Sequence, residues 1–303
     1  MPQFIYEGVP KERLDRFLAT QSYTRNFINR LVARGDITVN QKVITKNAHR
    51  LHPGDLITII HPERYMENSI LAQSPRLDLH IIKEKKDYLV VYKPKGVLSH
   101  PNSVWSVEHP NIVGALYHYF VDHQLPSTGT FIRAGLIHRL DKETDGLMLV
   151  AKTEAGLAYF KDLFQRKSLA PTKEEKDLVP LTKSYRAQCL LTKDGETFLA
   201  KIDPGYCINS LVKPRIPHYE PKQGITKIES RRITQDPTRV ELILSLYTGR
   251  THQIRVHLSE RGLPICGDYL YNPLPGGQEE KMALTAFHLS FIDNEGELIV
   301  CEV

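Results

Sequence analysis

Residues 135–153 read GLIHRLDKETDGLMLVAKT and join a polar loop to an apolar run. If the segment HRLD is extended, its side chains alternate between two faces, which puts Arg139 and Asp141 on one face and His138 and Leu140 on the other. The run GLMLVA that follows is typical of a buried strand. The stretch therefore predicts a carboxylate and a guanidinium on one face, just before a strand.

The acidic residues of this stretch allow three other interpretations. The letters DKETDG, which begin at Asp141, imitate the first six positions of a calcium loop, but the twelfth position is Lys152 where such a loop needs a bidentate Glu. Asp141 and Glu143 could instead hold the magnesium ion of a nuclease. Asp141 could also do no more than pair with an Arg on the surface. The lysine argues against calcium, whereas the residues alone leave the other two interpretations open.

Short apolar runs along the chain predict a sheet. They are LVVY (89–92), GLMLVA (146–151), YRAQCLL (185–191), VELILSL (240–246), IRVHL (254–258) and LIVCEV (298–303). Helical patterns occur around 112–121 and 154–165, without regular alternation between helix and strand. Residues 167–183 are charged and contain two prolines, so we expect an exposed loop there. The predicted fold class is α+β, with a mixed, mainly antiparallel sheet.

The N-terminal part of the chain predicts a small separate module. Apolar residues at helical spacing predict helices over 12–19 and 24–34. Thr24 is a candidate N-cap of the second helix, and Gly35 suits the position just past its end. Short strands are expected in DITVN, KVITK and PGDLITII. We therefore predict two short helices followed by a small sheet.

Charge and periodicity set the expected domain boundaries at residues 1–62, 63–79 and 80–303, the middle segment being a linker without a sustained period. The whole chain has a net charge of +5, and the first segment holds nine Lys and Arg against five Asp and Glu. A small basic module favours a polyanionic partner. The candidate binding residues there are Arg13, Arg25, Asn29, Arg30, Arg34 and Lys42.

Composition argues against several classes of protein. No apolar run approaches the roughly 20 residues that span a bilayer, and the acidic, mixed N-terminus does not read as a secretory signal. The four cysteines are widely spaced, which favours neither a zinc site nor disulfides. The two glycine-rich nucleotide-binding motifs, G-x-G-x-x-G and G-x-x-x-x-G-K-[ST], are both absent from the sequence. We expect a cytoplasmic protein with no membrane partner, no metal and no nucleotide cofactor.

The N-terminal layout resembles the S4 RNA-binding module. The resemblance covers roughly residues 11–60 and lies in RLDRFL, in a helix that opens with the basic Arg25, and in ARGDITVNQKVITKNAHRLHPGDLITI. Gln41 departs from the pattern, because the family commonly has Gly in that turn. The resemblance implies that this module binds RNA.

The central stretch resembles the signature of the RluA-type pseudouridine synthases. Three further motifs of that family follow the same order along the chain: DYLVVYKPKGVLSHP at 87–101, TKSYRAQC at 182–189 and YTGRTHQIRVHLSERGLPICGDYLY at 247–271. The resemblance implies a pseudouridine synthase domain that needs no cofactor, because the reaction is an isomerisation without redox change.

The resemblance also implies roles for single residues. Asp141 matches the catalytic aspartate, either as nucleophile or as base, and Arg255 its cationic partner. Tyr185 matches the tyrosine that stacks on uracil, and Arg139 the residue that takes the place of the flipped base. Arg250 is assigned to RNA phosphates. The KPKG turn is expected to be structural rather than chemical.

One position departs from this signature. Asp145 stands where the family usually has Ser. Its charge could repel an incoming phosphate, or its carboxylate could accept hydrogen bonds within the protein. We predict repulsion, so that Asp145→Ser would raise RNA affinity or speed turnover, and the acceptor role is the competing possibility.

The implied substrate is structured RNA, with ribosomal RNA of the large subunit first and transfer RNA second. We expect a monomer. The alternative from another class is a catalytically inactive RNA-binding or ribosome-assembly protein of the same fold.

Overall fold

The computed structural model describes residues 3–21, 23, 25–60, 71–101, 108–123, 135–217, 219–272 and 281–303. These residues form two compact units, one up to Ser74 with Glu108 and the other made of 75–101 and 109–303. Residues 63–70 of the predicted linker lie outside the described residues. The domain boundaries at residues 62 and 80 therefore stay predictions.

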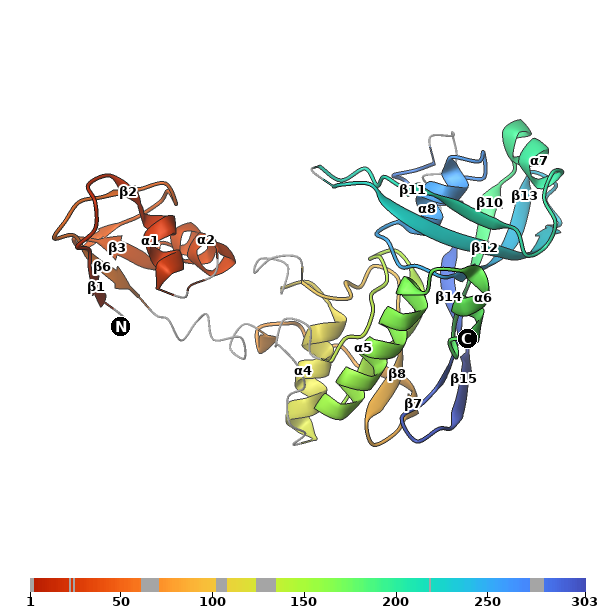
Figure 1. Ribbon diagram of the computed structural model, residues 1–303, viewed down its shortest axis with the longest axis horizontal. Coiled ribbons are helices and arrows are strands. Elements are labelled where there is room, and N and C mark those ends of the chain that lie inside the picture. Colours follow the sequence, from red (N-terminus) through yellow and green to blue (C-terminus); the bar gives the residue numbers. More distant parts are fainter. Residues whose placement is uncertain are drawn as a thin grey trace. The chain divides into compact units, whose positions relative to one another are not determined.

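The first unit packs two short helices on a small sheet (Figure 1). The helices are α1 (Leu14–Thr20) and α2 (Arg25–Arg34). The main sheet has the order β1 (Gln3–Ile5), β6 (Leu56–Ile59), β3 (Ile37–Val39), β4 (Lys42–Val43), and β2 (Glu12–Arg13) pairs with β5 (Arg50–Leu51). Leu18, Ile28 and Leu31 from the helices meet Ile37 and Ile57 from the sheet in one core. The predicted helices and strands are confirmed, and β1, β2 and β5 were not predicted.

Local backbone conformation explains two turns of this unit. Gly35 follows α2 with φ of 70°, the left-handed conformation that glycine adopts without strain, whereas Thr24 lies outside the described residues. Asn40 and Gln41 both have positive φ, as a tight turn between β3 and β4 requires. The Asn40 side chain fixes this turn by accepting a hydrogen bond from Leu56 N at 2.9 Å. The turn therefore forms without a glycine at position 41.

The second unit is built on one long sheet. Among the described residues its order is β11 (Cys207–Val212), β12 (Lys222–Ile233), β13 (Arg239–Leu246), β10 (Leu181–Leu190), β14 (Leu284–Ile292), β9 (Asp145–Ala151), β8 (Tyr88–Lys93), β7 (His80–Glu84), with β15 (Leu298–Glu302) also on β14. In the part of the chain that the structure describes, only the β14–β9 pair of this sheet is parallel. The prediction of a mixed, mainly antiparallel sheet is confirmed.

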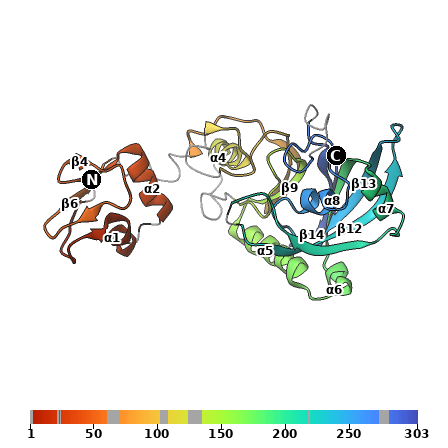
Figure 2. The same cartoon turned by 90° about the horizontal axis from the view of Figure 1, so that it is seen from above.

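Helices cover this sheet and complete its core. They are α4 (Ile112–Asp122), α5 (Glu154–Leu169), α6 (Lys173–Leu178), α7 (Lys193–Leu199) and α8 (Gln253–Ser259). Phe160 and Leu163 of α5 pack with Tyr88, Leu149 and Phe291 of the sheet. The α8 helix packs against β11 and β12 (Figure 2). The predicted helices around 112–121 and 154–165 are confirmed as α4 and α5.

Two predictions about this unit are wrong. The run IRVHL is part of α8 and not a strand, because residues 253–258 are all buried and a helix buried on every side shows no amphipathic period. Residues 167–183 are mostly exposed as expected, but they are not a loop, because α5 runs to Leu169, α6 occupies the middle and β10 begins at Leu181. The charged side chains of Lys167 and Lys176 are buried there.

Candidate active site

The HRLD segment lies before β9 and is held by the KPKG turn. Lys93 is fully buried, and its Nζ donates to the carbonyls of Pro94 and Val97 at 2.9 Å and of Lys142 at 3.0 Å. Gly96 N also donates to the Lys142 carbonyl at 2.9 Å. Burial lowers the pKa of Lys93 to about 8. These bonds fix the backbone next to Asp141, which fits the structural role expected for this turn.

The four side chains of the HRLD segment follow the predicted division into two faces only in part. Leu140 is buried, and Arg139 is exposed with its Nη1 3.1 Å from His100 Nε2. His138 stacks on Phe164 with ring centroids 5.1 Å apart and accepts a hydrogen bond from a β9 amide. Burial lowers the pKa of His138 to about 3, so the ring is neutral. All four HRLD residues border a cavity of about 270 Å³, so the predicted division into two faces does not decide which of them reach it.

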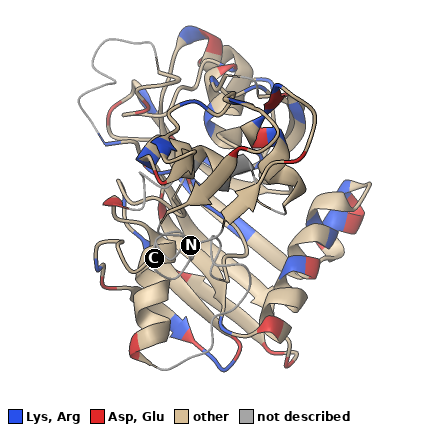
Figure 3. Ribbon diagram, turned by 90° about the vertical axis from the view of Figure 1, so that its left-hand side faces the viewer, with Lys and Arg blue, Asp and Glu red and all other residues tan. Residues whose placement is uncertain are grey.

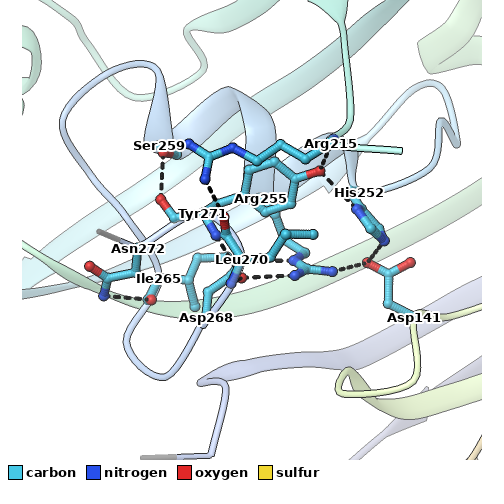
Figure 4. A network of polar contacts seen from close by, with 10 residues as sticks. All are labelled: Asp141, Arg215, His252, Arg255, Ser259, Ile265, Asp268, Leu270, Tyr271 and Asn272. Carbon is cyan, nitrogen blue, oxygen red and sulfur yellow. Dashed lines mark hydrogen bonds and ion pairs between the residues drawn. The ribbon is translucent and has the colours of Figure 1, made fainter. Parts of the chain in front are cut away.

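The carboxylate of Asp141 shares the guanidinium of Arg255 with a second carboxylate, that of Asp268 (Figure 4). Arg255 Nη1 lies 3.3 Å from Asp141 Oδ2, while Nε and Nη2 donate to the two oxygens of Asp268 at 2.7 and 2.8 Å. The side chains of Arg255 and Asp268 are 5% and 0% exposed, and that of Asp141 is 18% exposed. Two of the guanidinium nitrogens thus donate to Asp268, and the third faces the more exposed Asp141.

Burial alone would lower the pKa of Arg255, but its hydrogen bonds and attraction to Asp268, and then to Asp141, raise it. The guanidinium therefore stays charged. The predicted pairing of Asp141 with Arg255 is present in the structure, whereas Asp268 was not singled out from the sequence.

His252 completes this polar network and was also missed. It has a left-handed backbone with φ of 56°, and its Nε2 lies 4.0 Å from Asp141 Oδ2. Its Nδ1 is 2.8 Å from the hydroxyl of Tyr271, which accepts a hydrogen bond from Arg215 N at 2.9 Å. The hydroxyl is therefore free to donate its proton to Nδ1, which leaves the imidazole proton on Nε2, facing Asp141. Burial lowers the pKa of His252, which favours this neutral form.

Both residues missed by sequence reasoning stand inside the quoted motif of residues 247–271. Their letters, His252 in GRTHQ and Asp268 in CGDYLY, were therefore the signal that could have found them. What the motif does not show is the position of either side chain relative to Asp141.

Tyr185 and Arg250 border the same cavity as Asp141. Tyr185 lies on β10 and is 6% exposed, and burial, followed by the charge of Asp141, raises its pKa. Its phenol is therefore protonated at neutral pH. Arg250 Nε donates to the Gln223 carbonyl at 2.9 Å, which orients its guanidinium at the cavity.

Asp145 is part of a hydrogen-bonded cluster that holds the start of β9. Its two carboxylate oxygens accept bonds from the hydroxyls of Tyr92 and Thr285, both at 2.7 Å, and Lys95 Nζ lies 3.8 Å away. The next residue, Gly146, has φ of 118° and lies against the Ala286 backbone, where a Cβ would clash. The contacts support the second possibility for Asp145, that of an acceptor within the protein.

The candidate binding residues of the first unit have varied surroundings. Arg13 forms a bidentate ion pair with Asp15, in which its Nε and Nη2 donate to the two carboxylate oxygens at 2.9 and 2.7 Å. Asn29 accepts a hydrogen bond from Asn47, and Lys42 is exposed on β4. Arg34 lies in the last turn of α2, whereas the side chains of Arg25 and Arg30 lie outside the described residues. Basic and acidic residues are interspersed along the ribbon (Figure 3), so net charge alone does not mark an RNA-binding surface.

The described residues were also predicted to contain neither a metal site nor a membrane span. Within the described residues, no group of three His, Cys, Asp or Glu side chains is placed to hold a metal ion. None of the described helices is long and apolar enough to cross a membrane.

Known proteins resemble both parts of the chain. A family model described as RNA pseudouridylate synthase matches residues 87–260, and an S4 domain model matches residues 12–57. An uncharacterized RNA pseudouridine synthase of Aquifex aeolicus is 30% identical, with 99% of this chain and 92% of that protein covered. The uncharacterized RNA pseudouridine synthase YlyB of Bacillus subtilis is 32% identical, with 88% and 81% covered. The ribosomal large subunit pseudouridine synthase D of Yersinia pestis is 30% identical, with 87% and 74% covered.

Solved structures show the same fold. The human protein RNA Pseudouridylate Synthase Domain Containing 4 superposes with a TM-score of 0.52 at 18% identity, covering 79% of this chain and 92% of that one. A family match over more than half of the chain, together with 30% identity over 99% of it, establishes that this chain belongs to the RNA pseudouridylate synthases, with an S4 domain ahead of the synthase domain.

Proposed function

We propose that this enzyme converts specific uridines of large-subunit ribosomal RNA to pseudouridine. Support for this substrate comes from the S4 domain and from relatives named ribosomal large subunit pseudouridine synthase D. Transfer RNA is the second candidate. The observation that carries the proposal is the placement of Asp141, Arg255 and Tyr185 around one cavity.

The proposed reaction is an isomerisation centred on Asp141. The bond between uracil N1 and the sugar breaks, the uracil turns, and its C5 joins the sugar carbon, while the proton of C5 is lost and N1 gains one. Asp141 acts as an ionised nucleophile, or as base and electrostatic partner of the sugar carbon. Arg255 Nη1 lies 3.3 Å from Asp141 Oδ2 and pairs with it, and Asp268 holds Arg255 in place.

Tyr185 is assigned to the base. The neutral ring of Tyr185 can stack on uracil, and its hydroxyl can take part in the proton transfer at C5. Tyr185 is only 6% exposed, so a base that remains stacked in RNA cannot reach it and the uridine must flip out. Exposed Arg139 is assigned to the vacated place, and Arg250 to a phosphate.

The S4 domain is proposed to supply affinity for RNA. Exposed basic side chains bind phosphates with release of counterions, and Lys42 is such a residue. Arg13, Arg25, Asn29, Arg30 and Arg34 are the other proposed contacts. We further propose that the enzyme works as a monomer in the cytoplasm.

The alternative of an inactive RNA-binding protein is not favoured by any described contact. A protein that only binds RNA has no need of a carboxylate and a guanidinium paired at a cavity that also contains a buried tyrosine.

Mapping of pseudouridine tests the proposal. Total RNA from cells with and without the gene is compared, and the deleted strain is complemented with the wild-type chain or with Asp141→Asn. We expect pseudouridines in large-subunit ribosomal RNA to disappear on deletion and to return only with the wild type. If pseudouridines disappear only from transfer RNA, transfer RNA is the substrate instead of ribosomal RNA. An unchanged pseudouridine map would contradict the function.

A further inference from the structure

Two lysines border the same cavity as Asp141, and no catalytic role has been given to either of them. Lys183 lies on β10 two residues before Tyr185, and Lys167 lies in the last turn of α5. Lys183 Nζ is 5.0 Å from the ring centroid of Phe164, so its amine lies beside an apolar surface. Burial, followed by the charge of Lys167, lowers the pKa of Lys183 to about 8, which still leaves it mostly charged at pH 7.

The two lysines differ in their partners. Lys167 Nζ donates to the Lys176 carbonyl at 2.6 Å and lies 5.4 Å from the Tyr247 ring centroid. Lys183 Nζ has neither a hydrogen bond nor an ion pair with any described residue. The Lys183 side chain is half-buried, and its ammonium lies over the Phe164 ring at the cavity. All of its hydrogen-bonding capacity is therefore available to an acceptor that arrives with the substrate.

The corner between α5 and α6 fixes Lys167 in this position. Lys176 Nζ donates back to the carbonyls of Lys167 and Ser168, at 3.2 and 2.9 Å. The hydroxyl of Tyr247 donates to Asp177 of α6 at 2.6 Å. These contacts fix the corner between α5 and α6. The side chain of Lys167 is therefore buried at the border of the cavity.

The charges at the cavity favour an anion over a neutral group. Its charged residues are Asp141, whose carboxylate faces Arg255, and the basic residues Arg139, Lys167, Lys183, Arg250 and Arg255. A neutral uracil carbonyl would accept a hydrogen bond from Lys183 but leave its charge uncompensated. A phosphodiester supplies both an acceptor and a negative charge.

The spacing along β10 suits a nucleotide. Side chains two residues apart on a strand lie on the same side, about 7 Å from one another. A uracil stacked on Tyr185 has the phosphate of its own nucleotide at a similar distance. We propose that Lys183, together with Lys167, forms a subsite for a phosphate group adjoining the target uridine. This inference rests on the proposed function and adds a specific contact to it.

Small nucleotides test the subsite in the full-length chain. Binding of uridine, uridine 5′-monophosphate, uridine 3′-monophosphate and inorganic phosphate is measured by NMR titration at pH 7. One charge-assisted contact corresponds to about tenfold in affinity. We expect at least one uridine monophosphate to bind about tenfold more tightly than uridine, and inorganic phosphate to bind more weakly than that monophosphate.

Three variants localise the effect. Lys183→Met should bind uridine and its monophosphates equally well, whereas Lys183→Arg should keep the preference for the monophosphate. Lys161→Met changes an exposed lysine of α5 and should behave as wild type. Because Lys183→Met removes a charge without a partner, its thermal unfolding midpoint should not fall. If that variant does not fold, Lys183→Gln takes its place.

Three results would overturn the subsite. Wild type could bind uridine as tightly as both monophosphates, which would leave no phosphate contact. Lys183→Met could weaken uridine and monophosphates alike, which would mark a contact to the base. Inorganic phosphate could bind as tightly as either monophosphate, which would mark a site for free phosphate. The proposed function is tested by a different experiment, the mapping of pseudouridine in RNA. An unchanged map would contradict the function, whereas the binding preference for a monophosphate is measured without reference to that map.

Discussion

Arg255 Nη1 lies 3.3 Å from Asp141 Oδ2, although the two residues are 114 positions apart in the sequence. The guanidinium cannot turn away from Asp141, because its other nitrogens are bound to buried Asp268. The carboxylate proposed to react is thus the more exposed of the two that share one cation.

Asp141→Asn should remove turnover while leaving RNA affinity within a few-fold. The amide keeps the shape of the side chain but loses the negative charge on which the proposed chemistry depends. Single-turnover pseudouridine formation and equilibrium RNA binding are measured on the same preparation. Turnover within tenfold of wild type would show that Asp141 is not the reacting group.

Asp268→Asn should lower both stability and turnover. The amide cannot accept two charge-assisted bonds from Arg255, and breaking a buried ion pair costs about 3 kcal/mol or more. Urea unfolding and single-turnover rates measure the two effects. Asp162→Asn, which breaks an exposed pair with Arg166 on α5, is the matched control and should change stability by less than about 1 kcal/mol. Normal turnover in folded Asp268→Asn would refute the role of Asp268 in holding Arg255.

Asp145→Ser should destabilise the protein and slow turnover at both low and high salt. The shorter side chain cannot reach both the Tyr92 and Thr285 hydroxyls, and a lost charged acceptor costs about 1 to 3 kcal/mol. Single-turnover rates at two salt concentrations distinguish this effect from repulsion of phosphate. A variant that is faster at low salt only would favour repulsion instead.

Deletion of residues 1–62 should weaken RNA binding and flatten its dependence on salt. Each phosphate contact that is lost lowers the slope of the log–log plot by about 0.7 to 0.9. Binding is measured across a salt series, and circular dichroism checks that the remaining domain is folded. The same affinity and slope as in the full chain would assign the basic module to another partner.

Acid should destabilise the fold through His257. This residue is fully buried with Nδ1 2.9 Å from Thr226 Oγ1, and burial lowers its pKa from 6.5 to about 4. Between pH 6.5 and 4 the unfolded chain therefore binds more protons than the folded one, and the free energy of unfolding falls as pH falls, by about 2 kcal/mol at pH 5. Above pH 6.5 this residue has no such effect.

His257→Gln tests that window, because the variant keeps a polar side chain that does not titrate. Urea unfolding between pH 7 and 4.5 should show a smaller loss of stability in the variant than in wild type. Equal pH dependence in the two proteins would mean that His257 is not responsible.

The order of the domains, the mainly antiparallel sheet and the candidates Asp141, Tyr185 and Arg255 could all be predicted from the sequence. Half-buried elements have a period that can be read along the chain, and the motifs name residues without their positions. The tertiary structure alone decided that residues 253–258 are a helix, because an element buried on every side loses its period. It also decided that Asp268 meets Arg255 and that His252 meets Asp141, and that Lys183 lies at the cavity without a hydrogen bond or ion pair to any described residue. Such contacts join segments that are distant in sequence, so they depend on how the whole sheet packs and not on any local pattern.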